Sequence, residues 1–83
     1  MDLVYDLEGN FLHSSSEILS EDLPITILAV INQTYPGFII TDPAYELDYG
    51  NKVEYEVLLG GIGDGLEIVI TPDGTIIFEG ENN

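Results

Sequence analysis

The residues of this chain best suited to chemistry are its sixteen carboxylates and its single histidine. His13 is followed by Ser14, Ser15 and Ser16, but neighbours along a strand or loop do not adopt the geometry of a serine nucleophile and its base. Two carboxylates act as general acid and base only where a pocket separates their pKa values. The acidic residues lie on predicted strands of an exposed sheet, so the sequence argues against an enzyme.

A glycine-rich segment and two acidic turns are the other candidates for ligand binding. Residues 60–65 read Gly-Gly-Ile-Gly-Asp-Gly. A phosphate-binding loop needs a helix N-terminus after the glycines, whereas a strand is predicted here. Asp64 and Asp73 are weak metal candidates, because carboxylate oxygens suit calcium. The sequence has no EF-hand loop, so we predict no cofactor and keep calcium as an alternative.

One segment has the spacing of an amphipathic helix. Apolar residues recur at helical intervals at Leu23, Ile27, Val30 and Ile31. This spacing predicts a helix over residues 22–35. Pro24 suits its first turn, Ser20 or Asp22 is expected to cap it, and Gly37 follows its end.

The rest of the chain alternates apolar and polar residues, which predicts strands. A first hairpin turns at Glu8-Gly9-Asn10, after which residues 14–16 are expected to leave the strand for a polar loop. Further strands are predicted at residues 38–41, 45–49, 53–59, 66–71 and 75–78, followed by a polar tail at 79–83. The predicted fold class is α+β, with one helix packed on one face of a curved antiparallel sheet in the order hairpin, helix, meander.

The register of the central hairpin decides which side chains share a face. A three-residue loop at Gly50-Asn51-Lys52 places the apolar residues of both strands on one side of the sheet. In that register, three tyrosines pack beneath the helix: Tyr45, Tyr49 and Tyr55. The same register sets Asp48 opposite Glu54 and Glu46 opposite Glu56, an arrangement of like charges that costs stability. The predicted partner-binding face therefore consists of five carboxylates, Glu46, Asp48, Glu54, Glu56 and Glu67.

The composition bounds the classes of function. The chain of 83 residues is one small domain spanning residues 1–83, and 16 acidic residues against one Lys or Arg give a net charge of −15. Such a surface repels phosphate, which excludes nucleic acids and anionic lipids and favours a basic protein as partner. We find no cysteine, no run suited to membrane insertion and no signal-peptide pattern. Strand-like residues begin directly after Met1, which favours a trimmed or mature segment.

The first and last hairpins of the chain resemble each other. Residues 5–12 and 70–77 both place an acidic residue and a glycine between two apolar runs. This likeness is typical of a unit that occurs in tandem, and the limited chemistry of short turns can also produce it. Both interpretations stay open.

Over most of its length the sequence resembles the PepSY-like, beta-lactamase-inhibitor-like domains of Bacteroidetes and related bacteria. The resemblance rests on the order of five motifs: the hairpin at residues 6–11, Leu23-Pro24, Tyr35-Pro36-Gly37, Tyr55-Glu56-Val57 and Asp73-Gly74-Thr75-Ile76. It implies a helix on a curved antiparallel sheet, export to the periplasm or cell surface, and no catalysis. In inhibitor-like relatives the open sheet face docks a protein. Family members are commonly Lys-rich, whereas this chain has only Lys52, so its partner surface must differ in charge.

Together these observations predict a non-catalytic exported binding or regulatory module that recognises a basic protein through an acidic sheet face. Two alternatives belong to other classes. One is a calcium-responsive or purely structural acidic domain, and the other is an inhibitor of a secreted enzyme. The oligomeric state is not predicted.

Overall fold

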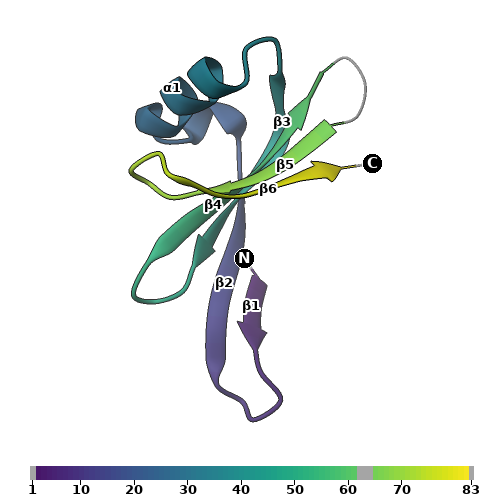
Figure 1. Ribbon diagram of the computed structural model, residues 1–83. Coiled ribbons are helices and arrows are strands. Elements are labelled where there is room, and N and C mark those ends of the chain that lie inside the picture. The colour runs from purple at the N-terminus through teal and green to yellow at the C-terminus, as the bar shows by residue number, and fades with distance from the viewer. Residues whose placement is uncertain (1, 62–64, 83) are drawn as a thin grey trace.

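The computed structural model describes residues 2–61 and 65–82. These residues form β1 (Asp2–Tyr5), β2 (Phe11–Ile18), a 3₁₀ turn (Ser20–Asp22), α1 (Ile25–Thr34), β3 (Ile39–Asp48), β4 (Val53–Gly60), β5 (Gly65–Ile70) and β6 (Ile76–Asn82). Each strand pairs antiparallel with the next, which gives one open sheet (Figure 1). The predicted α+β class and the order hairpin, helix, meander are confirmed. Within the described ranges, no helix has both the length and the apolar character needed to cross a membrane.

The helix is present where the apolar spacing predicts it, but it begins later. Leu23 and Pro24 have extended backbones, with ψ of 147° and 141°. For Leu23 the reason is that a residue that precedes proline is disfavoured in the helical region. The 3₁₀ turn therefore stays separate from α1, and no side chain caps α1. The predicted capping by Ser20 or Asp22 is wrong. The N–H group of Ser20 instead donates to Asp42 Oδ1 at 2.6 Å.

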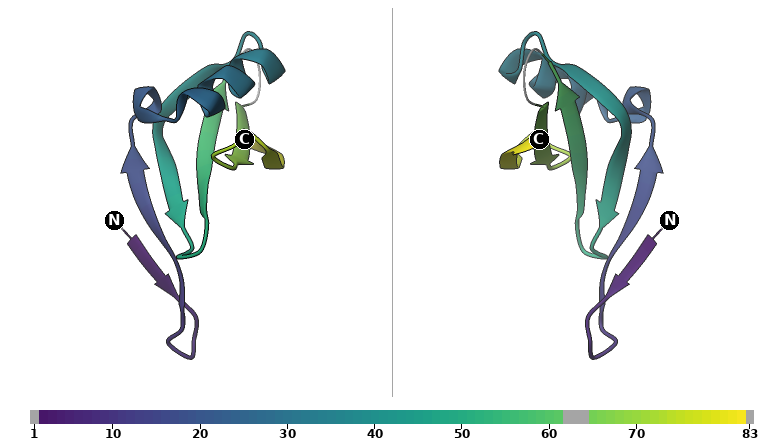
Figure 2. Two further views of the ribbon diagram at one scale, coloured as in Figure 1. Left: turned by 90° about the vertical axis from the view of Figure 1, so that its left-hand side faces the viewer. Right: turned by 90° about the vertical axis from the view of Figure 1, so that its right-hand side faces the viewer.

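The core lies between α1 and one end of the sheet. The helix crosses that end, and the β1–β2 hairpin extends from the opposite end (Figures 1 and 2). Burial is complete for Ile27 of α1 and for Val57, Ile68 and Ile70 of the sheet. We call the side of the sheet to which these strand residues point the helix face, and the opposite side the open face. Because successive side chains alternate along a strand, the pairing assigns each residue to one of them.

The predicted register of the β3–β4 hairpin is wrong by one residue. Asp48 pairs with Val53 and Leu47 pairs with Glu54, and the Tyr49 N–H donates to the Lys52 carbonyl at 2.9 Å. The loop thus has two residues, with Gly50 at φ +91° and its N–H bonded to Asp48 Oδ1 at 2.8 Å. An apolar pattern specifies register where one face is buried. This hairpin ends beyond the reach of α1, so the turn sets the register.

Three strand boundaries also differ from the sequence prediction. β2 continues through residues 14–16, because these serines pair with residues 46–48 of β3. β3 is a single strand whose register shifts between Thr41 and Tyr45, which accommodates Pro43, a residue without an N–H for the ladder. Residues 79–82 belong to β6 and not to a polar tail, since they pair with residues 65–68 of β5.

The likeness of the two terminal hairpins extends to their backbone hydrogen bonds. The Asp6 N–H donates to the Asn10 carbonyl and the Gly9 N–H to the Asp6 carbonyl, at 2.9 and 3.0 Å. Residues 71–75 repeat both bonds at 2.9 Å. The glycine of each turn has positive φ, and the register of each hairpin shifts near the turn. The shared hairpin sequence therefore encodes one turn type twice.

Candidate interaction face

The open face is the surface of the sheet opposite α1. Among the described elements, α1 packs on the helix face and none packs over the open face (Figure 2). One row of side chains crosses the middle of this face from β3 to β6. Its members are Tyr45, Glu56, Val69 and Phe78. Aromatic and aliphatic groups are therefore interleaved with acidic ones on a surface that is accessible to a partner.

The five carboxylates that we predicted to share one face are divided between two. Glu54, Glu56 and Glu67 lie on the open face, whereas Glu46 and Asp48 lie on the helix face beyond the end of α1. The expected pairs of Asp48 with Glu54 and of Glu46 with Glu56 do not exist. The register explains this result, because moving the pairing by one residue turns the acidic residues of β3 to the other side.

The register also moves two tyrosines that we predicted to pack beneath the helix. Tyr45 and Tyr49 lie on the open face, and Tyr55 alone packs against the helix-face core. The Tyr55 hydroxyl donates to Glu46 Oε2 at 3.4 Å. The open face thus contains aromatic residues that the sequence reasoning assigned to the core. The spacing of Tyr45 and Glu56 in a two-residue turn register is the signal that could have identified them.

Glu56 and Glu67 are neighbours on adjacent strands of the open face. Glu56 is half-buried, and its burial raises the pKa of its carboxyl group above the ordinary value. The charge of Glu67 and a hydrogen bond with it raise this pKa further. The ionised form of Glu56 is therefore less favourable in the folded chain than in the unfolded one.

We expect Glu56→Gln to raise the midpoint of thermal unfolding at neutral pH. Because the folded-state pKa of Glu56 lies above the unfolded one, folding takes up a proton between these two values, and stability rises as the pH falls through this window. The variant lacks this contribution, so its stability should rise less between pH 7 and about pH 5. Thermal melts at several pH values measure this difference. Glu17→Gln, which removes the same charge from an exposed position on the same face, is the matched control, and equal slopes in Glu17→Gln and Glu56→Gln contradict the prediction.

A second group of side chains occupies the β3–β4 end of the open face. The rings of His13 and Tyr49 lie 5.1 Å apart, and Lys52 Nζ lies 5.1 Å from the centre of the Tyr49 ring. Lys52 Nζ also lies 3.4 Å from Glu54 Oε2, and Glu54 is buried. Burial of Tyr49, followed by the charge of Glu54, raises the pKa of the tyrosine. The chain's only lysine thus neutralises the most buried acid of this face.

His13 lies on the open face, whereas the serine that follows it in the sequence lies on the helix face. His13 pairs with Val4 on β1, and Ser14 pairs with Leu3. Adjacent residues of a strand point to opposite faces, so the histidine and the buried Ser14 hydroxyl lie on different sides of the sheet. Sequence reasoning did not identify the contact of His13 with Tyr49, because it depends on strands that are distant in the chain.

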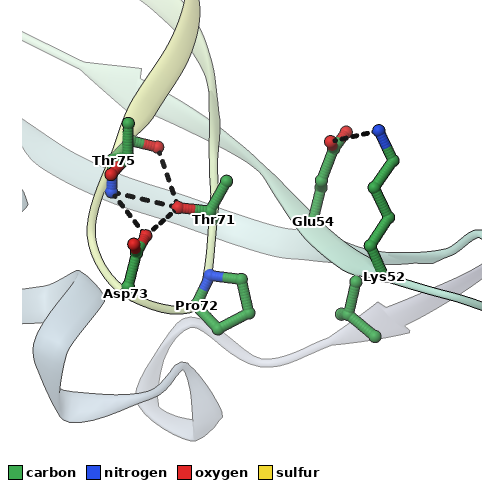
Figure 3. A pocket seen from close by; sticks show the side chains of 7 residues that line it. Lys52, Glu54, Thr71, Pro72, Asp73 and Thr75 are labelled. Carbon is green, nitrogen blue, oxygen red and sulfur yellow. Dashed lines mark hydrogen bonds and ion pairs between the residues drawn. The ribbon is translucent and has the colours of Figure 1, made fainter.

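A hollow of about 500 Å³ adjoins this end of the face where β4 continues past the end of β5 (Figure 3). Residues 52–54 line one side, and Thr71, Pro72, Asp73 and Thr75 of the β5–β6 turn line the other. Asp73 accepts hydrogen bonds from the Thr71 hydroxyl and from the Thr75 N–H. These bonds, the first of them above all, lower the pKa of Asp73. Its carboxylate is engaged in closing the turn.

Of the two weak metal candidates, the structure describes only Asp73, whose carboxylate accepts the hydrogen bonds from Thr71 and Thr75. Asp64 lies outside the described residues. Across residues 2–61 and 65–82, no group of three His, Asp or Glu side chains is arranged to hold a metal ion.

Comparison with known proteins identifies a related fold. No family model and no curated protein matches the sequence. Among solved structures, the chain is similar to the crystal structure of a DUF2874 family protein from Bacteroides uniformis, with a TM-score of 0.83 and 14% sequence identity. The alignment covers 95% of this chain and 60% of that one. At this identity the likeness shows the fold alone.

Proposed function

We propose that this chain is a PepSY-like domain of an exported protein and that it acts as a non-catalytic binding or regulatory module. Its partner is a protein with a basic and partly apolar surface, and the open face is the surface that recognises it. The order of sequence motifs and the fold shared with the Bacteroides protein support the family. Export to the periplasm or cell surface belongs to the same proposal.

The observation that carries the proposal is the composition of the open face. Tyr45, Val69 and Phe78 offer apolar contact area beside Glu56 and Glu67, and aromatic residues contribute strongly to protein interfaces. Burial, followed by repulsion from Glu67, raises the pKa of Glu56, and a cationic side chain placed between these two acids relieves the repulsion. The net charge of −15 attracts a basic partner from a distance.

Two double variants with the same change of charge separate recognition by the open face from attraction to net charge. Glu56→Gln/Glu67→Gln removes two charges from the open face, and Glu46→Gln/Asp48→Asn removes two from the helix face. The probes are folded proteins with pI above about 9, titrated into the labelled chain and followed by amide chemical shifts. We expect the open-face pair to weaken binding about fivefold and the helix-face pair less than about twofold at physiological ionic strength.

Several outcomes contradict the proposal. Equal weakening by both double variants shows that net charge alone attracts the probes. Shift changes that cluster on α1, away from Tyr45 and Phe78, place the interface elsewhere. The absence of saturable binding to any basic probe removes the proposal, and thermal melts of both variants exclude loss of fold as the cause.

A further inference from the structure

β6 forms one edge of the sheet, and its outer backbone groups can be assigned. The hydrogen bond from Tyr49 N–H to the Lys52 carbonyl fixes which residue pairs are hydrogen-bonded. In an antiparallel ladder these pairs alternate. The same alternation continues through the pairs of β4 with β5 and of β5 with β6. It places the amide groups of Phe78 and Gly80 on the side of β6 that faces β5. The N–H and C=O groups of Glu79 and Glu81 therefore point away from the sheet.

The side chains of this edge combine apolar and acidic groups. Ile77 and Phe78 are 50% and 51% exposed, and Glu79 and Glu81 are exposed beside them. Glu79 accepts a hydrogen bond from the Tyr35 hydroxyl at 2.9 Å, which attaches the middle of β6 to the end of α1. The edge is thus held in an extended conformation, a condition that favours the addition of another strand.

The opposite edge of the sheet is less suited to such an addition. β1 has four residues and its register shifts between Val4 and Tyr5, and short, bulged edges resist pairing. β6 has seven residues, and its irregularity lies at its start, opposite Val69 and Ile70. From Phe78 onward the pairing is regular.

We infer that β6 accepts a basic, extended segment of a partner protein as a seventh strand. Main-chain hydrogen bonds to Glu79 and Glu81 provide the pairing, and alternating Lys or Arg and apolar side chains match the acidic and apolar groups of this edge. A second copy of the chain is a poor occupant, because it brings two chains of charge −15 together and places glutamates opposite glutamates. This inference goes beyond the proposed function, since pairing at β6 does not need the open face to be occupied.

The probe is the peptide acetyl-Lys-Val-Lys-Val-Lys-Val-Lys-amide, titrated into the labelled chain. We expect saturable shift changes at residues 77–81 and slower hydrogen exchange of the Glu79 and Glu81 amides. The control peptide has the same sequence, but its central Val and the Lys that follows it are N-methylated. This removes one amide proton from each of the two edges of the bound peptide strand. We expect this control to bind at least about tenfold more weakly, because its charge is intact but its pairing is blocked.

Variants of β6 and of the open face distinguish the edge from the face. Glu81→Pro removes an outward N–H and should weaken binding about tenfold, whereas Glu81→Gln keeps it and should weaken binding less than about threefold. Glu56→Gln/Glu67→Gln should change the affinity less than about twofold. If Glu81→Pro disturbs β6 itself, the two peptides still decide the question on the wild-type chain.

Three results overturn the inference. Equal binding of the methylated and the unmodified peptide shows attraction by charge alone. Shift changes that fall on Glu56 and Glu67 and not on β6 support the proposed function but not the edge. A peptide that does not bind at about 1 mM shows that β6 is not a docking edge.

Discussion

Replacement of Ile27 by alanine is expected to lower the free energy of unfolding by about 3 kcal/mol. Ile27 has no exposed surface and lies in the first turn of α1, in one core cluster with buried residues of β4 and β5. The substitution removes its contacts and leaves a cavity between helix and sheet. A domain of this size has about 5–10 kcal/mol of stability in total. The loss therefore removes a large part of it, and urea unfolding at constant pH measures the change.

Ile25→Ala is the matched control on the same helix. Its side chain is 82% exposed, so the same change of residue type should alter the free energy of unfolding by less than about 0.5 kcal/mol. Similar losses in both variants contradict the packing of α1 described above. If Ile27→Ala leaves too little folded protein to measure, Ile27→Val, with an expected loss of about 1 kcal/mol, tests the same contact.

The position of α1 could be predicted because several independent signals agree on it. The predicted apolar spacing runs through Leu23, which precedes α1, and through Ile27 and Ile31 of the helix, and all three are buried in one core cluster with residues of the sheet. The β-strand residues beneath the helix, such as Val57 and Ile68, follow the alternation that a single buried face requires. Where the apolar side of the helix and the apolar side of the sheet bury each other, the sequence determines the structure unambiguously.

The face of the candidate site could be predicted only in part, because that agreement ends where the helix ends. The rule that apolar residues point inward predicts Tyr45 and Tyr49 on the helix face, but the two-residue turn at Gly50 places them on the open face. No burial requirement opposes this turn at that end of the sheet. Glu54 was identified correctly as an open-face residue, but its burial and its contact with Lys52 depend on that register and could not be predicted.

The two terminal hairpins share one turn type and yet have different roles in the fold. The β5–β6 turn lies close against α1. A Cβ atom added at Gly74 would lie only 2.8 Å from Val30 Cγ2. The corresponding turn of the β1–β2 hairpin extends from the far end of the sheet (Figure 1), and a Cβ atom on Gly9 has no neighbour within 4 Å. The same local sequence pattern therefore packs against the helix in one case only.

This difference predicts unequal effects of alanine at two glycines with nearly equal backbone angles. Gly9 and Gly74 have φ of +86° and +92°, so each substitution costs about 1 kcal/mol of backbone strain. Gly74→Ala also forces its methyl group against Val30, and we expect a total loss of about 3 kcal/mol. Denaturant unfolding of both variants measures the difference, which should be about 2 kcal/mol in favour of Gly9→Ala.

A double-mutant cycle with Val30→Ala tests whether the contact with α1 causes the larger loss. Val30→Ala removes the methyl group that the new Cβ atom meets, so Gly74→Ala should cost about 1–2 kcal/mol less in that background. The cost of Gly9→Ala should be the same in both backgrounds, because Gly9 has no contact with Val30. Equal costs for Gly74→Ala with and without Val30 show that the β5–β6 turn does not hold the helix, and that the core residues alone position α1 on the sheet.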